Sequence, residues 1–404
     1  MSGSVLILGG DGFCGWPTAL HLSAQGYDVA IVDNLSRRSI DDQLGASSLT
    51  PIASIDERLA AWRSVTGKEI PFWGIDIAAD YSGFRNVVSQ RRPDAIVHFA
   101  EQRSAPYSMK GVNEKNYTID NNVRTTHHTL LAMVELGLDA HLVHLGTTGV
   151  YGYSTVDMVI AEGYLDVIIP LEEGRSIRDT ILYPTQPGSI YHLTKSLDQL
   201  LFQFYAQNDR LRITDLHQGI VWGTQTAETR RHPALVNRFD YDGDYGTVLN
   251  RFLVEAAIGY PLTVHGTGGQ TRGFINIQDT VRCVALALEN PPAAGEKPRI
   301  FNQVAETKRV RDLAEMIAGM TGAQIAFVDN PRKEAVENEL ALSNQSFLDL
   351  GLAPILLEEQ LFTETIEIVG AYKDRIDREL IPAQSLWTTG HRPGLVKHLK
   401  GSGS

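Results

Sequence analysis

VLILGGDGFCGW, residues 5–16, joins a short apolar run to a turn with three glycines. Gly9, Gly12 and Gly15 give the spacing G-x-x-G-x-x-G, which is typical of the turn between the first strand and the first helix of a dinucleotide-binding fold. The first glycine permits a tight turn, the second lets the backbone approach a pyrophosphate, and the third lets the helix pack on the strand. The helix then presents N–H groups and a positive dipole end to the phosphates. A glycine-rich turn without a ligand is the alternative, and the residues downstream decide between the two.

Short apolar runs alternate with helical stretches through the first half of the chain. The runs are bounded by Gly, Pro or Asp, as expected for parallel strands buried on both faces. They are Val5–Leu8, Asp28–Val32, Ile70–Trp73, Ala95–Phe99, His141–Leu145 and Arg212–Leu216. Helical periodicity covers Pro17–Gln25, Asn121–Leu136 and Leu193–Gln207. The alternation predicts an α/β protein with a Rossmann-type, doubly wound parallel sheet.

The pattern loosens after about Gly219. Residues 223–246 are polar and indicate a long functional loop, and helices are expected around 310–321 and 358–378. We therefore expect a dinucleotide-binding domain over 1–219 and a smaller α/β substrate-binding lobe over 220–395, with some return to the first domain. Residues 396–404 read as a tail.

Charge and cysteine content narrow the class of protein. The net charge of −12 disfavours nucleic acid or an anionic membrane as the main partner. Two cysteines cannot form a disulfide framework, and no apolar run is long enough to span a bilayer. No targeting segment is visible, so the expected location is cytoplasmic, without membrane insertion.

An acidic residue at the end of the second strand points to NAD. Asp33 is placed to accept both ribose hydroxyls of the adenosine and to repel a 2′-phosphate. Arg37 and Arg38 would favour NADP instead, although a solvated face is the alternative for at least one of them. We favour NAD because Asp33 lies at the strand tip. Further cofactor contacts are expected from Phe13, Cys14, Asn34, Arg37, Asp76, Ile77, Phe99, Asn121 and Gln218.

Tyr191 and Lys195 form Y-x-x-x-K in YHLTK. On a helix these positions share a face, so the ammonium lies beside the phenol and is expected to lower its pKa. Thr147 follows a strand, and its hydroxyl can hydrogen-bond the substrate oxygen that Tyr191 deprotonates. Taken alone, Y-x-x-x-K more often places an exposed Tyr on an amphipathic helix, and a Thr such as Thr147 more often belongs to a Thr-rich turn. Together with the glycines and Asp33, the three predict a redox site in which Tyr191 and Lys195 also contact the cofactor. No metal is expected.

These elements, in this order, resemble the extended short-chain dehydrogenase/reductase family of nucleotide-sugar epimerases and dehydratases. The resemblance runs from about residue 5 to about 390. The most specific motif is HFAEQRSAPYSM (98–109), and LGTTGVYG (145–152), YHLTK (191–195), TDLHQG (214–219), GTGGQTRGFINIQDT (266–280) and NPRKEA (330–335) accompany it. The resemblance implies NAD as cofactor and a homodimer built through two helices of each subunit, one of them carrying Tyr191.

Within that family the chain resembles the branch that joins UDP-glucose and sulfite into a sulfonated sugar nucleotide. The implied route oxidises C4, eliminates water across C5–C6, adds sulfite at C6 and returns the hydride.

Other branches fit less well or stay open. A 4,6-dehydratase is disfavoured, because Thr148 and Gly149 replace the expected Asp-Glu pair. A UDP-hexose 4-epimerase or 5,6-dehydratase remains open, and so does a non-catalytic NAD-binding sensor or scaffold. Val150 replaces the expected glutamate, which leaves Glu101, His192 and Glu162 as candidates for the C5/C6 acid/base.

The resemblance also suggests which residues hold the substrate. Arg103 is the candidate sulfite contact, with Gln186, Ser189 and His192 as further donors; a salt bridge is the alternative for Arg103. Arg272 and Arg332 are the candidates for the diphosphate, since guanidinium groups match it in forked geometry. Thr147, His217, Asn250, Thr263 and Gln270 complete the expected substrate set.

The segment between Gly152 and Tyr191 is longer than in many epimerases. Its strand-like runs, Val156–Ile160 and Leu165–Leu171, predict a hairpin near the site. Such a hairpin could restrict water or dock a partner that delivers sulfite.

Overall fold

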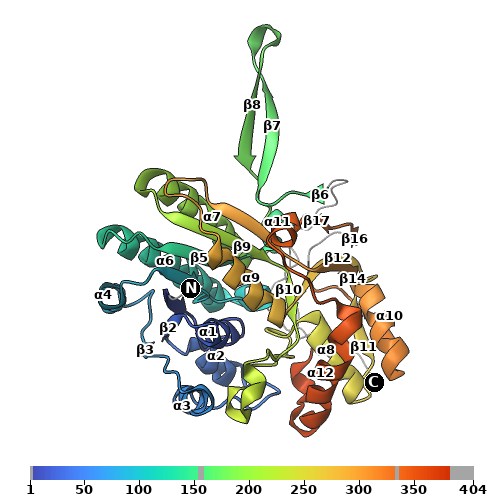
Figure 1. Ribbon diagram of the computed structural model, residues 1–404. Helices are drawn as coiled ribbons and strands as arrows, with labels where there is room; N and C mark the ends of the chain where they lie inside the picture. Colours follow the sequence, from blue (N-terminus) through green and yellow to red (C-terminus); the bar gives the residue numbers. More distant parts are fainter. Residues whose placement is uncertain (1–2, 153–158, 333–335, 383–404) are drawn as a thin grey trace.

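Seven parallel strands form the central sheet, seen in the ribbon of the computed structural model (Figure 1). The structure describes residues 3–152, 159–332 and 336–382. In spatial order the strands are β13 (Arg299–Gln303), β9 (Arg212–Gln218), β5 (His141–Thr147), β4 (Ala95–His98), β1 (Ser4–Leu8), β2 (Asp28–Asp33) and β3 (Phe72–Gly74). The order reverses between β1 and β4, and doubly wound sheets bind ligands at the carboxyl ends of the strands next to that point. The predicted fold class is confirmed.

Two hydrophobic cores lie on the two faces of this sheet. Alternate residues of β1 separate between them: Val5 and Ile7 belong to one core, and Leu6 and Leu8 to the other. This follows from the two-residue period of a strand. Because helices cover both faces, a ligand can reach the strands at their carboxyl ends.

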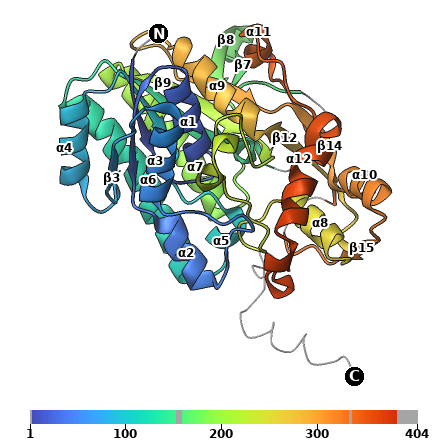
Figure 2. The same cartoon turned by 60° about the horizontal axis from the view of Figure 1, so that its bottom comes forward.

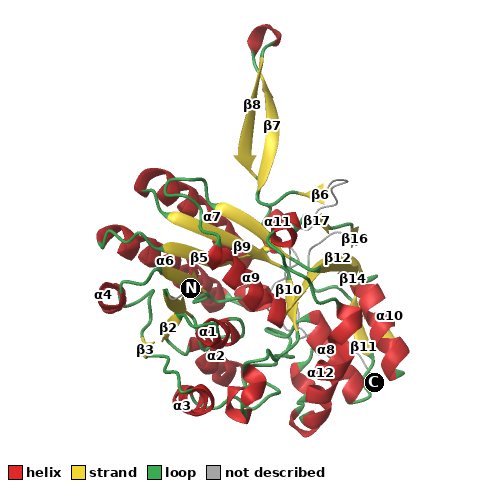
Figure 3. Cartoon of the chain, in the orientation of Figure 1, coloured by secondary structure: helices red, strands yellow, loops and turns green. Residues whose placement is uncertain are grey.

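Helices cover both faces (Figure 3). The core that contains Val5 is closed by α1 (Gly15–Ala24), α3 (Ile55–Thr66) and α9 (Ile277–Glu289). The opposite core is closed by α4 (Tyr81–Arg91), α6 (Val112–Glu135) and α7 (Ile190–Asp209), with α6 packed along α7. The shorter helices α2 (Ser36–Leu44) and α5 (Ala105–Ser108) follow β2 and β4 in the chain.

A smaller lobe lies beside the sheet, with a third core of its own (Figure 2). Its strands are β10 (Ile220–Trp222), β12 (Gly269–Asn276), β14 (Glu306–Arg309) and β16 (Glu337–Asn338), with the separate pair β11 (Leu262–His265) and β15 (Ile325–Val328). Its helices are α8 (Val248–Ala257), α10 (Val310–Thr321) and α12 (Leu357–Ala371). Strand β13 leaves this half of the chain and pairs with β9, so the chain returns to the central sheet.

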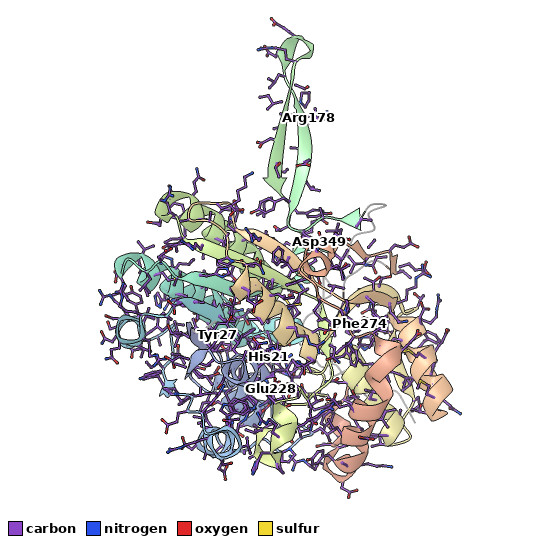
Figure 4. All side chains as sticks on the ribbon, in the orientation of Figure 1. His21, Tyr27, Arg178, Glu228, Phe274 and Asp349 are labelled. Carbon is purple, nitrogen blue, oxygen red and sulfur yellow. The ribbon has the colours of Figure 1, made fainter. Side chains whose placement is uncertain are left out.

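A β-hairpin projects from the body and is called the arm here (Figure 1). It pairs β7 (Tyr164–Pro170) with β8 (Ser176–Leu182) in antiparallel register. Figure 4 shows Arg178 on the arm, away from the body. The arm contacts the body at its base, where the Tyr164 hydroxyl donates to the carbonyl of Pro298, 2.7 Å away.

The hairpin prediction was correct in kind but wrong in pairing. Residues 153–158 lie outside the described residues, and the end of the first predicted run forms β6 (Val159–Ile160), which pairs with β17 (Ala341–Leu342). The partner of β7 is instead the charged segment β8, which has little apolar alternation to announce it.

Other boundaries also differ. Helix α6 begins at Val112, well before the predicted Asn121, because its first turns are polar and carry no apolar stripe. Helix α12 ends at Ala371, and a separate turn, Lys373–Arg375, follows it. The polar segment 223–246 is not an open loop. It contains two short turns, Thr229–Arg231 and Pro233–Leu235, and buries Phe239, Tyr241 and Tyr245.

The burial of β4 leads to a stability prediction. Ile96 is fully buried at the centre of the sheet, whereas Ile168 on the arm is 64% exposed. Ile96→Ala should lower the free energy of unfolding by about 2–5 kcal/mol because it leaves a cavity. Ile168→Ala should change it by less than about 0.5 kcal/mol. Urea unfolding followed by circular dichroism measures both, and equal losses would contradict the exposed position of the arm.

Candidate functional site

A single continuous pocket brings most of the predicted residues together. It runs from the glycine turn across the carboxyl ends of β2, β4, β5 and β9 into the lobe. Of the predicted set it is lined by Gly9, Gly12, Phe13, Cys14, Asp33, Asn34, Arg37, Ile77, Phe99, Arg103, Asn121, Thr147, Tyr191, His192, Lys195, Gln218, Thr263, Gln270, Arg272 and Arg332.

The glycine turn is shaped as a phosphate cradle requires. Gly9 has φ +80°, and a Cβ there would lie 2.7 Å from the backbone of Phe99 and Ala100. At Gly15 a Cβ would lie 2.0 Å from the Gly9 carbonyl oxygen. Neither position accepts a side chain. Helix α1 begins at Gly15 at the pocket wall and has no acidic residue in its first turn, so its positive end stays available to an anion. These features fit the pyrophosphate of a dinucleotide.

The residues around Asp33 fit NAD rather than NADP. The Asp33 carboxylate accepts hydrogen bonds from the N–H groups of Asp11 (2.9 Å) and Leu35 (2.7 Å). Burial, together with the charge of Asp11, raises the pKa of Asp33 to about 6. Arg38 donates two hydrogen bonds to Asp11, at 2.7 and 2.9 Å. Arg37 pairs with Asp41 and lies 3.7 Å above the ring of Tyr245. Both arginines are therefore compensated by carboxylates, and neither offers an isolated charge to a 2′-phosphate.

The redox residues meet where β5 ends. Thr147 is the last residue of that strand, and Tyr191 and Lys195 lie one turn apart on α7. The backbone N–H of Tyr191 donates to the Ser108 hydroxyl (3.1 Å), and the Lys195 ammonium donates to the carbonyl of Leu145 (2.7 Å). The first link ties α7 to α5, and the second ties it to β5.

The expected effect of Lys195 on the phenol is outweighed in this structure. Burial is the largest influence, and it raises the pKa of Tyr191 to about 12 together with the charge of Glu101. Lys195 and the hydrogen bond with Thr147 act in the opposite direction. Lys195 therefore acts on the phenol in the predicted direction, but burial of the phenol outweighs it, and a carboxylate beside Lys195 opposes it as well.

That carboxylate is Glu101. It follows β4 and lies with Oε2 2.7 Å from Lys195 Nζ. Its other oxygen accepts from His144 Nε2 at 2.9 Å, and His144 Nδ1 lies 2.8 Å from Asp215. His144 and Asp215 were missed. Their signal in the sequence is an ionisable residue within a strand predicted to be buried on both faces.

The far end of the pocket is cationic. Arg272 and Arg332 line it as predicted, with Thr263 and Gln270. Arg251 and His265 line it as well and were missed. Burial, with the charges of Arg332 and Arg272, lowers the pKa of His192 to about 3, so this imidazole is neutral.

Five predicted residues do not line the pocket. Asn250 precedes Arg251 on α8, so its side chain points elsewhere and donates to the carbonyl of Asp240 (2.9 Å). Asp76 accepts from Asn34 (3.1 Å), and Ser189 caps α7 by accepting from the His192 N–H (3.1 Å).

His217 is buried between Asp215 and Tyr151. Gln186 is exposed, and its backbone N–H donates to Val150.

Arg103 forms a salt bridge of the kind weighed as the alternative, and its contact with sulfite stays a prediction. Its guanidinium pairs with Asp240, and about a third of the side chain stays exposed at the pocket wall. Of the candidates for the C5/C6 acid/base, Glu162 is bound to Ser346 outside the pocket. Val150 is buried and also lies outside it.

No helix among the described residues is both long enough and apolar enough to cross a bilayer.

Solved structures of similar fold are sugar-nucleotide enzymes. The UDP-glucose 4-epimerase of Thermotoga maritima with UDP-glucose aligns with a TM-score of 0.68 at 21% identity, covering 92% of this chain and all of that one. The UDP-glucose 4-epimerase of Bifidobacterium longum with NAD⁺ and UDP aligns with a TM-score of 0.64 at 18% identity, covering 91% and 98%. At these identities the likeness shows the fold.

Sequence comparison is more specific. The profile of the NAD dependent epimerase/dehydratase family matches residues 5–303. The chloroplastic UDP-sulfoquinovose synthase of Spinacia oleracea is 46% identical over 97% of this chain and 81% of that protein. The UDP-sulfoquinovose synthase of Sulfolobus acidocaldarius is 38% identical over 98% of this chain and its own full length. The chain therefore belongs to the NAD-dependent epimerase/dehydratase family, with NAD as its cofactor, and within that family to the UDP-sulfoquinovose synthases.

Proposed function

We propose that this chain converts UDP-glucose and sulfite to UDP-sulfoquinovose, as the names of its relatives suggest. One observation of the structure carries the proposal: the redox residues and a set of arginines line the same pocket. Tyr191 and Lys195 lie at the sheet edge, and Arg251, Arg272 and Arg332 lie in the lobe. A sugar nucleotide with its diphosphate on the arginines would extend its hexose toward Tyr191.

The first step removes the hydrogen on C4 of the glucose as a hydride and the hydrogen of the C4 hydroxyl as a proton. NAD, when bound, supplies a hydride acceptor that later returns the hydride. Tyr191 takes the proton of the C4 hydroxyl, Thr147 hydrogen-bonds the same oxygen, and Lys195 supplies positive charge beside the phenol. The resulting C4 ketone acidifies the C5 proton.

Water then leaves across C5–C6, with the C5 proton and the C6 hydroxyl. Sulfite sulfur bonds to C6 of the resulting enone and C5 regains a proton. Reduction of the ketone then requires hydride at C4, and Tyr191 returns its proton to the C4 oxygen. The sum is one UDP-glucose and one hydrogen sulfite giving one UDP-sulfoquinovose and one water.

We assign the C5/C6 proton transfers to His192. Its ring centroid lies 5.3 Å from that of Tyr191, and it lines the pocket. Glu101 is committed to Lys195, and Glu162 lies outside the pocket. A diphosphate on Arg272 and Arg332 would offset the charges that lower the pKa of His192, and so make the imidazole a better base in the complex.

Sulfite is assigned to the wall that carries Arg103. Asp240 holds one side of its guanidinium, and the exposed remainder faces the pocket. A guanidinium oriented in this way suits a small oxyanion.

A homodimer through α6 and α7 is also proposed. Leu200 and Phe204, one turn apart on α7, are 59% and 57% exposed. An apolar pair on the outer face of this helix is what an interface between two copies would bury.

The decisive test of the function is product analysis. Purified protein with UDP-glucose should form a more acidic and heavier UDP-sugar only when sulfite is added, because a sulfonate adds a charge. Anion-exchange chromatography with mass spectrometry detects it. A product formed without sulfite would assign a 4-epimerase or dehydratase, and absence of any turnover with NAD binding retained would assign a sensor or scaffold.

Loss of the phenol should remove the proton acceptor. Tyr191→Phe is expected to lower kcat by about 100-fold or more, the usual contribution of general acid–base catalysis. Tyr164→Phe is the matched control, because that hydroxyl donates to Pro298 at the base of the arm and lies outside the pocket. Steady-state rates of product formation compare the two, and similar rates for Tyr191→Phe and the control would reject the assigned base.

Asp33 should control cofactor affinity. Asp33→Asn is expected to raise the Kd for NAD by roughly 10–100-fold, since hydrogen bonds to a charged acceptor are replaced. Wild-type affinity should decline as the pH falls below about 6, the pKa of Asp33, because protonation removes the anionic acceptor. Calorimetric titration measures both effects. Asp42→Asn on the exposed side of α2 is the control, and a pH dependence that persists in Asp33→Asn would exclude Asp33 as its source.

A further inference from the structure

A buried group of ionisable side chains lies beneath the catalytic helix. Lys195 is 4% exposed, and His144, Asp198 and Asp215 are at most 1% exposed. They come from β5, α7 and β9, and Glu101 joins them from the segment after β4. The proposed reaction uses only Lys195, so the role of the others is open.

The shortest contacts of the group link cations to carboxylates, although Lys195 Nζ also lies 3.1 Å from His144 Nε2. Lys195 Nζ lies 2.7 Å from Glu101, and Glu101 accepts from His144 at 2.9 Å. His144 reaches Asp215 at 2.8 Å. The Thr126 hydroxyl also donates to Glu101, at 3.1 Å. Every oxygen of Glu101 is therefore committed to a donor or a cation of this chain.

The protonation of the group follows from these contacts. Burial and Lys195 lower the pKa of His144, but Asp215 and Glu101 outweigh them and raise it to about 9. Burial raises the pKa of Glu101, yet Lys195 and His144 hold it below its ordinary value. Burial and the charge of Glu101 raise the pKa of Asp198 well above its ordinary value, which favours its protonated form. Two cations and two carboxylates then balance, and Glu101 offsets part of the effect of Lys195 on the pKa of the Tyr191 phenol, adding to the larger effect of burial.

We propose that Glu101 is a positioning residue and counter-ion of Lys195 that keeps Tyr191 protonated until a further positive charge enters the pocket. The titratable and charged groups that face Tyr191 are Lys195 and His192 on its own helix, and Glu101 and Arg103 from the segment after β4. The oxidised nicotinamide ring is a cation and would supply the missing field. Tyr191 would thus accept a proton when the ring is oxidised and hold it while the ring is reduced.

This arrangement suits a reaction that keeps a ketone in the pocket between two hydride transfers. A phenol that stays protonated in that interval keeps the proton that the C4 oxygen must regain. The inference rests on the proposed function for its purpose, but its first test, a titration, needs neither a sugar nucleotide nor sulfite.

The test is a titration of tyrosinate absorbance in the purified full-length protein. Each protein is compared with the same protein carrying Tyr191→Phe, so that the difference reports Tyr191 alone. In the wild type, Tyr191 should not ionise until about pH 12. Glu101→Gln keeps the shape and hydrogen bonding of the side chain but removes its charge, and the midpoint should fall by about one pH unit or more. Glu101→Asp keeps the charge and should leave the midpoint near the wild-type value.

Glu228→Gln is the matched control. Glu228 is a buried carboxylate in another histidine pair, with His21 Nδ1 2.9 Å away, and it lies outside the pocket (Figure 4). It should leave the Tyr191 midpoint unchanged. A folded Glu101→Gln protein with an unshifted midpoint would overturn the proposal. If that variant does not fold, a wild-type Tyr191 that ionises near neutral pH would overturn it equally.

A second readout separates positioning from mere structural support. Without sulfite, reduction of bound NAD by UDP-glucose can be followed by its absorbance as a function of pH. Loss of the counter-ion should move the acid limb of this profile to lower pH, whereas structural damage would lower the rate at every pH without moving it. A lowered but unshifted profile counts against the proposal. Failure of the product assay alone would reject the function and leave the titration result standing.

Discussion

The ammonium of Lys195 lies out of water, and a charge in that position is tolerated because Glu101 lies 2.7 Å away. The buried Glu101 carboxylate is also hydrogen-bonded to His144, and the charge of His144 is balanced by Asp215. Since these residues come from three neighbouring strands or strand ends and from α7, the requirement for compensated charge ties the catalytic helix to the carboxyl edge of the sheet. The positions of Tyr191 and Thr147 depend on it.

Pairing of arginines with carboxylates also determines which charges are presented at the cofactor end of the pocket. Asp11 is held by Arg38 and Arg58, and Arg37 by Asp41, so that the adenosine side presents Asp33 rather than an isolated guanidinium. At the lobe end, Arg251, Arg272 and Arg332 gather in a chain with a net charge of −12. The overall charge repels an anionic substrate, and this local cluster provides the attraction.

The sequence predicted the elements with a strong local signal. The glycine turn, the strand alternation and Y-x-x-x-K located the sheet, the cofactor loop and α7 to within a few residues. It could not predict which side chains meet across distant segments. His144 and Asp215 look like interruptions of apolar strands until the register aligns them with each other. Asn250 and Arg251 differ by one helical step, which rotates a side chain by roughly 100°, and periodicity alone did not show which faces the pocket. The pairing of β7 with β8 likewise depends on a charged strand without an apolar pattern.

Strand β13 completes the sheet only after the chain has passed through β10, β11 and β12 of the lobe. During synthesis on a ribosome, therefore, the first 298 residues emerge while β9 still has an open edge. Such an edge is a template for pairing with other chains, and domains generally fold from the N-terminus as they emerge. Nascent chains should need protection over this interval, and truncation before Arg299 should yield an aggregating species although it retains Thr147, Tyr191 and Lys195.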